Sequence, residues 1–191
     1  MNVHQLSFSY VAEQDRILAR VNTQEGRELQ FWITRRLALG ITPLIERAVA
    51  EQTANKVGVP ADQLAVMDAL AKKSIAEFRR GESLKQADFA TPYKSPVGNA
   101  PMFEQPLLVT EMNLAPLKTG HMRMRCSEKL GPEPGNRRFE MVLSEQLAHA
   151  FAHLLERALQ QSQWREVGIG AMGGVAAQDP SGNADKPGYL N

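Results

Sequence analysis

Short stretches of the chain alternate apolar and polar residues, which is the pattern of β-strands that bury one face. Two stretches, residues 28–33 and 138–143, place apolar side chains at every second position, namely Leu29, Phe31, Ile33, Phe139, Met141 and Leu143. Four more stretches have the same period: residues 6–12, 16–22, 107–114 and 121–127. Short polar turns separate the early strands, as hairpins require. The pattern predicts two groups of three strands.

A helix is predicted after the third strand of each group. Thr34 and Ser144 stand at the junctions, and both residue types are good N-caps because their side-chain oxygen accepts a hydrogen bond from a free backbone N–H. Pro43 interrupts the first helix, so we expect either a kink there or a restart with Thr42 as N-cap. Apolar residues recur at helical spacing in both helices: Leu37, Ile41, Leu44, Ile45 and Ala48 in the first, and Leu147, Phe151, Leu154, Leu155 and Ala158 in the second.

The two groups also resemble each other in sequence. Residues 28–51 align with residues 138–161 without a gap, and six of the 24 aligned positions are identical. The strand period, the capping residue and the phase of the apolar helical stripe also match between the two aligned segments. The sequence therefore predicts an α+β fold with two β-β-β-α units related by pseudo-twofold symmetry.

The predicted organisation has four parts. Residues 1–52 form the first repeat, 53–104 an insertion, 105–165 the second repeat and 166–191 a flexible Gly-rich tail. The Pro-rich residues 84–106 are expected to form a loop or an extended crossover. Residues 60–80 have the spacing of an amphipathic helix, with an apolar stripe made of Leu64, Met67, Ala71, Ile75 and Phe78.

Composition narrows the classes of protein that fit. The chain carries 22 basic and 21 acidic residues, so a strong basic excess, the simplest argument for a nucleic-acid or anionic-membrane partner, is missing. Cys126 is the single cysteine, which excludes an intramolecular disulfide. The first residues show no secretory signal pattern, and no apolar run approaches the length of a membrane span. We therefore expect a cytoplasmic protein that contacts no membrane.

Motifs for catalysis or cofactor binding are weak. Residues 168–173 have Gly-x-Gly-x-x-Gly spacing, but they follow a helix and open the Gly-rich tail, so we reject a dinucleotide site. Glu145, His149 and His153 share one helical face opposite the apolar stripe, where we expect solvation, with an interface role or a metal as alternatives. Cys126 lies in the apolar phase of its strand and should pack in the core. We expect no enzymatic activity, no cofactor and no metal.

The outer faces of the strands carry the more informative residues. If the alternating apolar side chains face inward, the opposite phase exposes arginines and one tryptophan: Arg16, Arg20, Trp32, Arg123, Arg125 and Arg138. Arginine neutralises phosphates and an exposed aromatic ring stacks on bases, as in single-strand binders. Trp and Arg are also enriched in protein interfaces, and an antiparallel sheet often leaves one face to water. These three interpretations stay open on the sequence alone.

The arrangement is similar to the duplicated sheet-then-helix units of Whirly proteins and purine-rich-element binders, although those repeats have four strands and three are found here. The resemblance implies single-stranded DNA or RNA as the ligand. Our first hypothesis is a non-enzymatic binding protein that holds single-stranded nucleic acid on the six outer-face residues. The alternative is a protein–protein assembly or adaptor protein, a homodimer or a complex with another protein, that uses the same face.

Overall fold

The computed structural model describes residues 1–56, 69–86, 93–95, 101–117, 119–130 and 137–165. Three strands and a helix come first, with a 3-10 turn at Ala12–Gln14. They are β1 (Val3–Val11), β2 (Arg16–Thr23), β3 (Glu28–Thr34) and α1 (Arg35–Lys56). Helix α3 (Ala69–Gln86) follows. The second half contains β4 (Leu107–Leu108), β5 (Glu111–Pro116), β6 (Met122–Ser127), β7 (Arg138–Leu143) and α4 (Glu145–Ser162).

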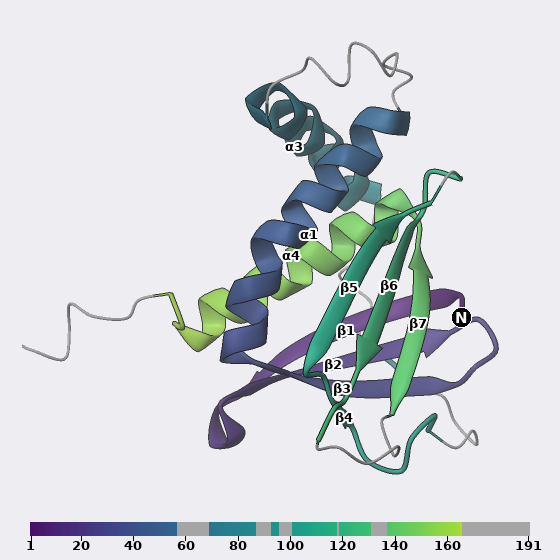
Figure 1. The fold of residues 1–191 in the computed structure, drawn as a ribbon, viewed down its shortest axis with the longest axis vertical. Coiled ribbons are helices and arrows are strands. Elements are labelled where there is room, and N and C mark those ends of the chain that lie inside the picture. Colours follow the sequence, from purple (N-terminus) through teal and green to yellow (C-terminus); the bar gives the residue numbers. More distant parts are fainter. Residues whose placement is uncertain (57–68, 87–92, 96–100, 118, 131–136, 166–191) are drawn as a thin grey trace, which may run out of the picture.

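The strands form two sheets in a mixed α+β fold. Sheet 1 has the order β1-β2-β3-β4 and sheet 2 the order β5-β6-β7, with every neighbouring pair antiparallel except β3 and β4. In Figure 1, sheet 2 lies in front of sheet 1 and its strands cross those behind, while α1 and α4 lie along one side of the two sheets. The described helices include none with the length and apolar content that a bilayer span needs.

The apolar phases of the two sheets face each other, as the alternation predicts. The rings of Phe31 in β3 and Phe139 in β7 lie 5.0 Å apart between their centroids. Phe8 of β1 meets Phe151 of α4 edge to face at 4.9 Å, so α4 closes the core beside β1. Cys126 is buried in this core as expected, and burial raises the pKa of its thiol. Side chains in the other phase of each strand therefore point outward.

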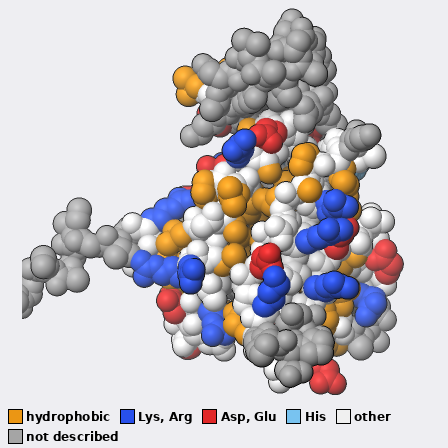
Figure 2. Space-filling view, in the orientation of Figure 1, with side chains coloured by type: hydrophobic (Ala, Val, Ile, Leu, Met, Phe, Trp, Pro, Cys, Tyr) orange, Lys and Arg blue, Asp and Glu red, His pale blue; other side chains and the backbone are white. Residues whose placement is uncertain are grey.

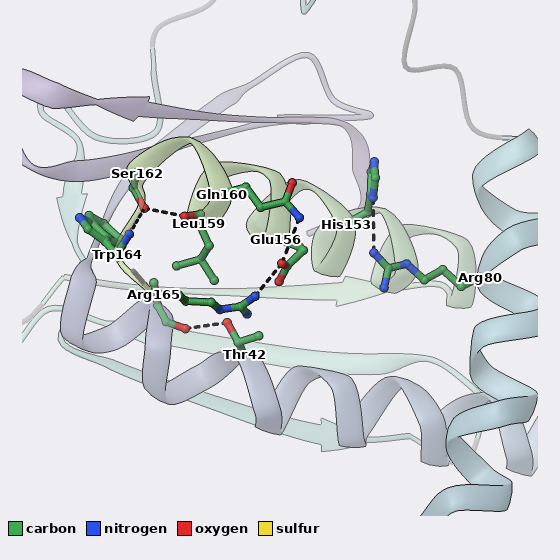
Figure 3. Close-up of polar contacts among 10 residues, drawn as sticks. Thr42, Arg80, His153, Glu156, Leu159, Gln160, Ser162, Trp164 and Arg165 are labelled. Atoms are coloured by element: carbon green, nitrogen blue, oxygen red, sulfur yellow. Dashed lines mark hydrogen bonds and ion pairs between the residues drawn. The ribbon is translucent and has the colours of Figure 1, made fainter. Parts of the chain in front are cut away.

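Both predicted N-caps are present. The Leu37 N–H donates to Thr34 Oγ1 and the Leu147 N–H to Ser144 Oγ, each at 3.3 Å. Helix α1 continues through Pro43, so the restart at Thr42, the alternative to a kink, does not occur. The Thr42 hydroxyl instead donates to the Ala38 carbonyl one turn back at 2.7 Å (Figure 3).

Other expectations about these elements need correction. The stretch 107–114 is two short strands: Leu107 and Leu108 pair in parallel with β3, and the chain then crosses to sheet 2 as β5. Leu44 is 56% exposed and Phe78 is 71% exposed, so neither belongs to a buried stripe. Residues 60–68, the tail from 166 and the motif at 168–173 lie outside the described residues.

The predicted solvated face of α4 is in fact partly covered by other helices. His149 is 1% exposed, and its Nε2 lies 3.3 Å from the hydroxyl of Thr53 in α1. Arg80 of α3 reaches His153, with 3.4 Å between Nη2 and Nδ1 (Figure 3). Burial, followed by the charge of Arg80, lowers the pKa of His153, and burial is the main cause that lowers the pKa of His149. The expectation failed because the position of α3 could not be foreseen.

We expect the protein to lose stability as the pH falls from about 7 to about 5. The lowered pKa of His149 means that the unfolded chain takes up a proton before the folded protein does. The neutral ring therefore contributes fully above the unfolded pKa of about 6.5, and protonation favours unfolding below it. Thermal unfolding of the His149→Gln variant should show a smaller loss over this range, with His153 supplying the remainder. Equal losses in the variant and the wild type would contradict this.

A polar cluster joins the β1–β2 turn to the end of α4. Trp164 is 4% exposed, and its Nε1–H donates to Asp15 Oδ1 at 2.6 Å. The Tyr10 hydroxyl donates to the same oxygen at 2.9 Å, and the Tyr10 and Trp164 rings meet edge to face at 5.6 Å. Arg35 Nη2 donates to the Trp164 carbonyl at 3.1 Å. The hydrogen bonds from Trp164 and Tyr10, that of Trp164 first, lower the pKa of Asp15. The Trp164 bond joins the end of α4 to the hairpin, and the Arg35 bond joins the start of α1 to the end of α4.

Candidate functional site

The structure divides the six predicted outer-face residues between two surfaces. The inner faces of the sheets pack together through Phe31 and Phe139, so their outer faces point away from each other. Arg16, Arg20 and Trp32 lie on the outer face of sheet 1, and Arg123, Arg125 and Arg138 lie on the outer face of sheet 2. A single surface carrying all six residues is therefore not formed.

The outer face of sheet 1 is covered at one end. The Tyr93 hydroxyl shares its single hydrogen between two acceptors, Asn22 Oδ1 at 2.6 Å and Glu28 Oε1 at 2.9 Å. Asn22 Nδ2 donates to the Lys94 carbonyl at 2.6 Å, and the Ser95 hydroxyl donates to Glu28 Oε1 at 3.3 Å. Burial, reinforced by the Glu28 carboxylate, raises the pKa of Tyr93. Asn22 and Glu28 are thereby buried on a face that the sequence predicts to be open.

The middle of the sheet 1 outer face combines a buried leucine with half-buried tryptophan and arginine side chains. Leu18 is 8% exposed and lies opposite Trp32, which in turn pairs with Leu108. Arg16 and Arg20 flank Leu18 on β2, and both are half-buried. The Nε of Arg20 is buried and has no hydrogen-bond partner in the part of the chain that is described. This surface combines tryptophan, leucine and arginine, the composition of protein interfaces.

The outer face of sheet 2 is more open and more polar. Arg125 and Glu140 pair directly across β6 and β7, with 2.5 Å between Nε and Oε2. Lys129 and Glu111 form a second ion pair at 2.5 Å. The hydrogen bond from Arg125, with the nearby charge of Arg123, lowers the pKa of Glu140. These pairs are exposed, so each contributes little to stability and both carboxylates stay ionised at neutral pH.

Two arginines of this face have no ion-pair partner within the part of the chain that the structure describes. Neither Arg123 nor Arg138 forms an ion pair with any described residue. Arg138, at the end of β7, is exposed and borders a hollow of about 970 Å³. Figure 2 shows Lys and Arg side chains gathered over β6 and β7, beside a hydrophobic band over β5 and α1. The arrangement presents excess positive charge to solvent; it has no outward-facing aromatic ring among the described residues of β5, β6 and β7.

A buried carboxylate holds the two sheets together beside this face. Glu128 is 6% exposed, and its Oε1 accepts from the Leu108 N–H of β4 at 2.9 Å. Its Oε2 accepts from Arg137 Nε at 2.5 Å, and this bond is the main cause that lowers the pKa of Glu128. Arg137 also donates to the Gln105 carbonyl at 2.9 Å. The pair fixes the strand ends that carry Ser127 and Arg138.

Sequence reasoning missed Tyr93, Glu128 and Trp164. The partners of Tyr93 and Trp164 are far away in sequence, so no local signal marks them, and Glu128 lies beyond the last residue of β6, outside the alternating pattern. Comparison of the chain with protein-family models, curated proteins and solved structures finds no match. Within the described residues, no cluster of His, Cys, Asp and Glu has the geometry to hold a metal ion. The geometry offers binding surfaces, and the evidence for function comes from them.

Proposed function

We propose that the protein is a non-enzymatic binding protein that holds single-stranded nucleic acid on the outer face of sheet 2. Arg123, Arg125 and Arg138 would contact phosphates there. The observation that carries this proposal is that three guanidinium groups share one open face, two of them without an ion pair among the described residues. We also propose a cytoplasmic location, which a chain with a single cysteine, and so no intramolecular disulfide, permits.

The spacing of the arginines suits a phosphate backbone. Arg123 and Arg125 project from the same face of β6, about 7 Å apart along the strand, and Arg138 extends the charge onto β7. Guanidinium groups bind phosphate through two parallel hydrogen bonds. Because Trp32 lies on the opposite sheet, base stacking contributes little, and we expect weak dependence on base sequence.

Charge reversal on each sheet separates the two faces experimentally. The double variant Arg123→Glu/Arg138→Glu should weaken binding of a labelled single-stranded oligonucleotide at low salt by at least about tenfold, because two phosphate contacts become repulsive. Arg16→Glu is the matched control, since Arg16 lies on the outer face of sheet 1. Fluorescence anisotropy measures both, and circular dichroism confirms that the variants fold. Equal affinity of the double variant and the wild type, or an equal loss in the control, would overturn the assignment.

The outer face of sheet 1 supports a second candidate function, protein–protein assembly. Trp32 lies between Leu18 and Leu108 and is flanked by Arg16 and Arg20, and Trp and Arg dominate interface hot spots. An assembly formed there should survive high salt and dissociate in the Trp32→Ala variant. Light scattering of the wild type and this variant at high salt tests it; unchanged mass in the variant would exclude this surface.

We also propose that the two β-β-β-α units are copies of one unit, related by a pseudo-twofold axis. Trp32 and Val142 stand at equivalent positions of the aligned repeats, and each pairs in parallel with the leading residues of the other unit, Leu108 and Asn2. Helix α4 packs on β1, and α1 packs on β5. Equal cap distances at Thr34 and Ser144 add support. An experimental structure in which the units do not superpose would contradict this.

A further inference from the structure

Strand β1 is an edge strand whose second edge is open along most of its length. It pairs with β2 from Val3 to Val11, and no described strand hydrogen-bonds to its other side. The inward-facing Leu6 and Phe8 are only half-buried, whereas their partners on β2, Val21 and Ala19, are fully buried. The exposure of Leu6 and Phe8 therefore comes from the open edge.

A groove runs along this edge between β1 and α4. It has a volume of about 770 Å³, and its apolar part is formed by Leu6 and Phe8 of β1 with Leu147, Ala150 and Leu154 of α4. Leu147 and Leu154 lie two turns apart on the same side of α4, and both are half-buried. The groove thus sets an edge to which no described strand hydrogen-bonds beside an apolar wall, which is the arrangement that an added β-strand occupies.

The composition of β1 leaves this edge unprotected. Natural edge strands avoid pairing by carrying charges, proline or a short length. β1 is nine residues long and contains no Asp, Glu, Lys, Arg or Pro. The corresponding edge strand of sheet 2, β5, has six residues and carries both Glu111 and Pro116. Of these two strands, only β5 therefore has such protections.

The pattern of β1 is also self-complementary. When a twofold axis passes through its middle residue, Ser7, all nine residues overlap and each side chain keeps its face. Leu6 then lies opposite Phe8 of the second copy, and Gln5 lies opposite Ser9. Since β1 contains no Asp, Glu, Lys or Arg, the axis brings no like charges of these residues together. The nearby cations Lys94 and Arg157 lie off the strand itself.

We propose that this edge is the interface of a homodimer, in which β1 pairs antiparallel with β1 of a second copy around Ser7. Sheet 1 then continues across the axis into its counterpart, and the apolar groove is covered. This inference stands independently of nucleic-acid binding, because Leu6, Ser7 and Phe8 at its centre are not among the residues proposed to contact phosphates.

Complementary charges at Ser7 test the dimer and its register together. Wild type should have twice the chain mass of 21.2 kDa by light scattering at high protein concentration and high salt. Ser7→Lys and Ser7→Glu should each have the mass of one chain, because like charges then lie opposite each other at the axis. A mixture of the two variants should recover twice the chain mass. Asn113→Lys on β5 is the matched control and should keep the wild-type mass.

Recovery in the mixture shows that both variants are folded. A wild type with the mass of one chain at every concentration would overturn the proposal. The groove would then be a candidate site for an extended peptide of a different protein. Variants at Ser7 that keep twice the chain mass would place the interface elsewhere. If the two Ser7 variants are folded, have the mass of one chain and do not associate when mixed, the proposed register around Ser7 is wrong. None of these outcomes depends on whether an oligonucleotide binds.

Discussion

Alanine in place of Trp164 is expected to lower the free energy of unfolding by about 3–5 kcal/mol. The indole is 4% exposed and packs edge to face on Tyr10, so its removal leaves a cavity between the hairpin and α4. It also removes the Nε1–H hydrogen bond to Asp15, which carries a negative charge. Chemical denaturation of the wild type and the variant measures the difference.

Trp164→Phe separates packing from the hydrogen bond. This variant keeps an aromatic ring against Tyr10 and loses the donor to Asp15, so we expect a smaller cost of about 1–3 kcal/mol. The Tyr10 hydroxyl still donates to the same carboxylate oxygen, which limits the loss. If Trp164→Ala cost less than about 1 kcal/mol, the end of α4 would not be fixed to the β1–β2 turn.

The second large effect is expected at the contact between the sheets. Phe31 has no exposed surface, and its ring centroid lies 5.0 Å from that of Phe139. Phe31→Ala should destabilise the fold by about 3–5 kcal/mol, because it opens a cavity between the sheets that neither can collapse to fill. Equilibrium unfolding in denaturant measures this cost.

Phe78→Ala is the matched control for this substitution. Phe78 is 71% exposed on α3, and an exposed side chain that fills no cavity should change stability by no more than about 0.5 kcal/mol. Similar costs for Phe31→Ala and Phe78→Ala would mean that the inner faces of the sheets do not pack through Phe31 and Phe139. The residues assigned to the two outer faces would then have to be revised.

The strands and caps could be predicted because each depends on local pattern. Alternation around Phe31 and Phe139 marks the inner face of each sheet, and Thr34 and Ser144 mark the helix starts. The buried phase of β2, β3, β6 and β7 follows from the same alternation. The sequence also indicated which arginines point outward, since they fall in the opposite phase.

The grouping of these arginines could not be predicted. Whether two outward faces join or oppose each other depends on how the sheets pack, and that is decided by the contact between Phe31 and Phe139. The burial of His149 could not be predicted for the same reason, because it depends on how α1 and α3 pack against α4. Tyr93 covers Asn22 from 71 residues away in sequence, so no local pattern indicates the contact.

The most direct measurement is the salt dependence of single-stranded DNA and RNA binding to the wild-type protein by fluorescence anisotropy. Three phosphate contacts, at Arg123, Arg125 and Arg138, predict a slope of about −2 when the logarithm of the association constant is plotted against that of salt concentration. We expect measurable binding at low salt with this slope. Absence of binding at low salt, or binding that does not change with salt, would contradict the assignment of sheet 2 as a nucleic-acid interface.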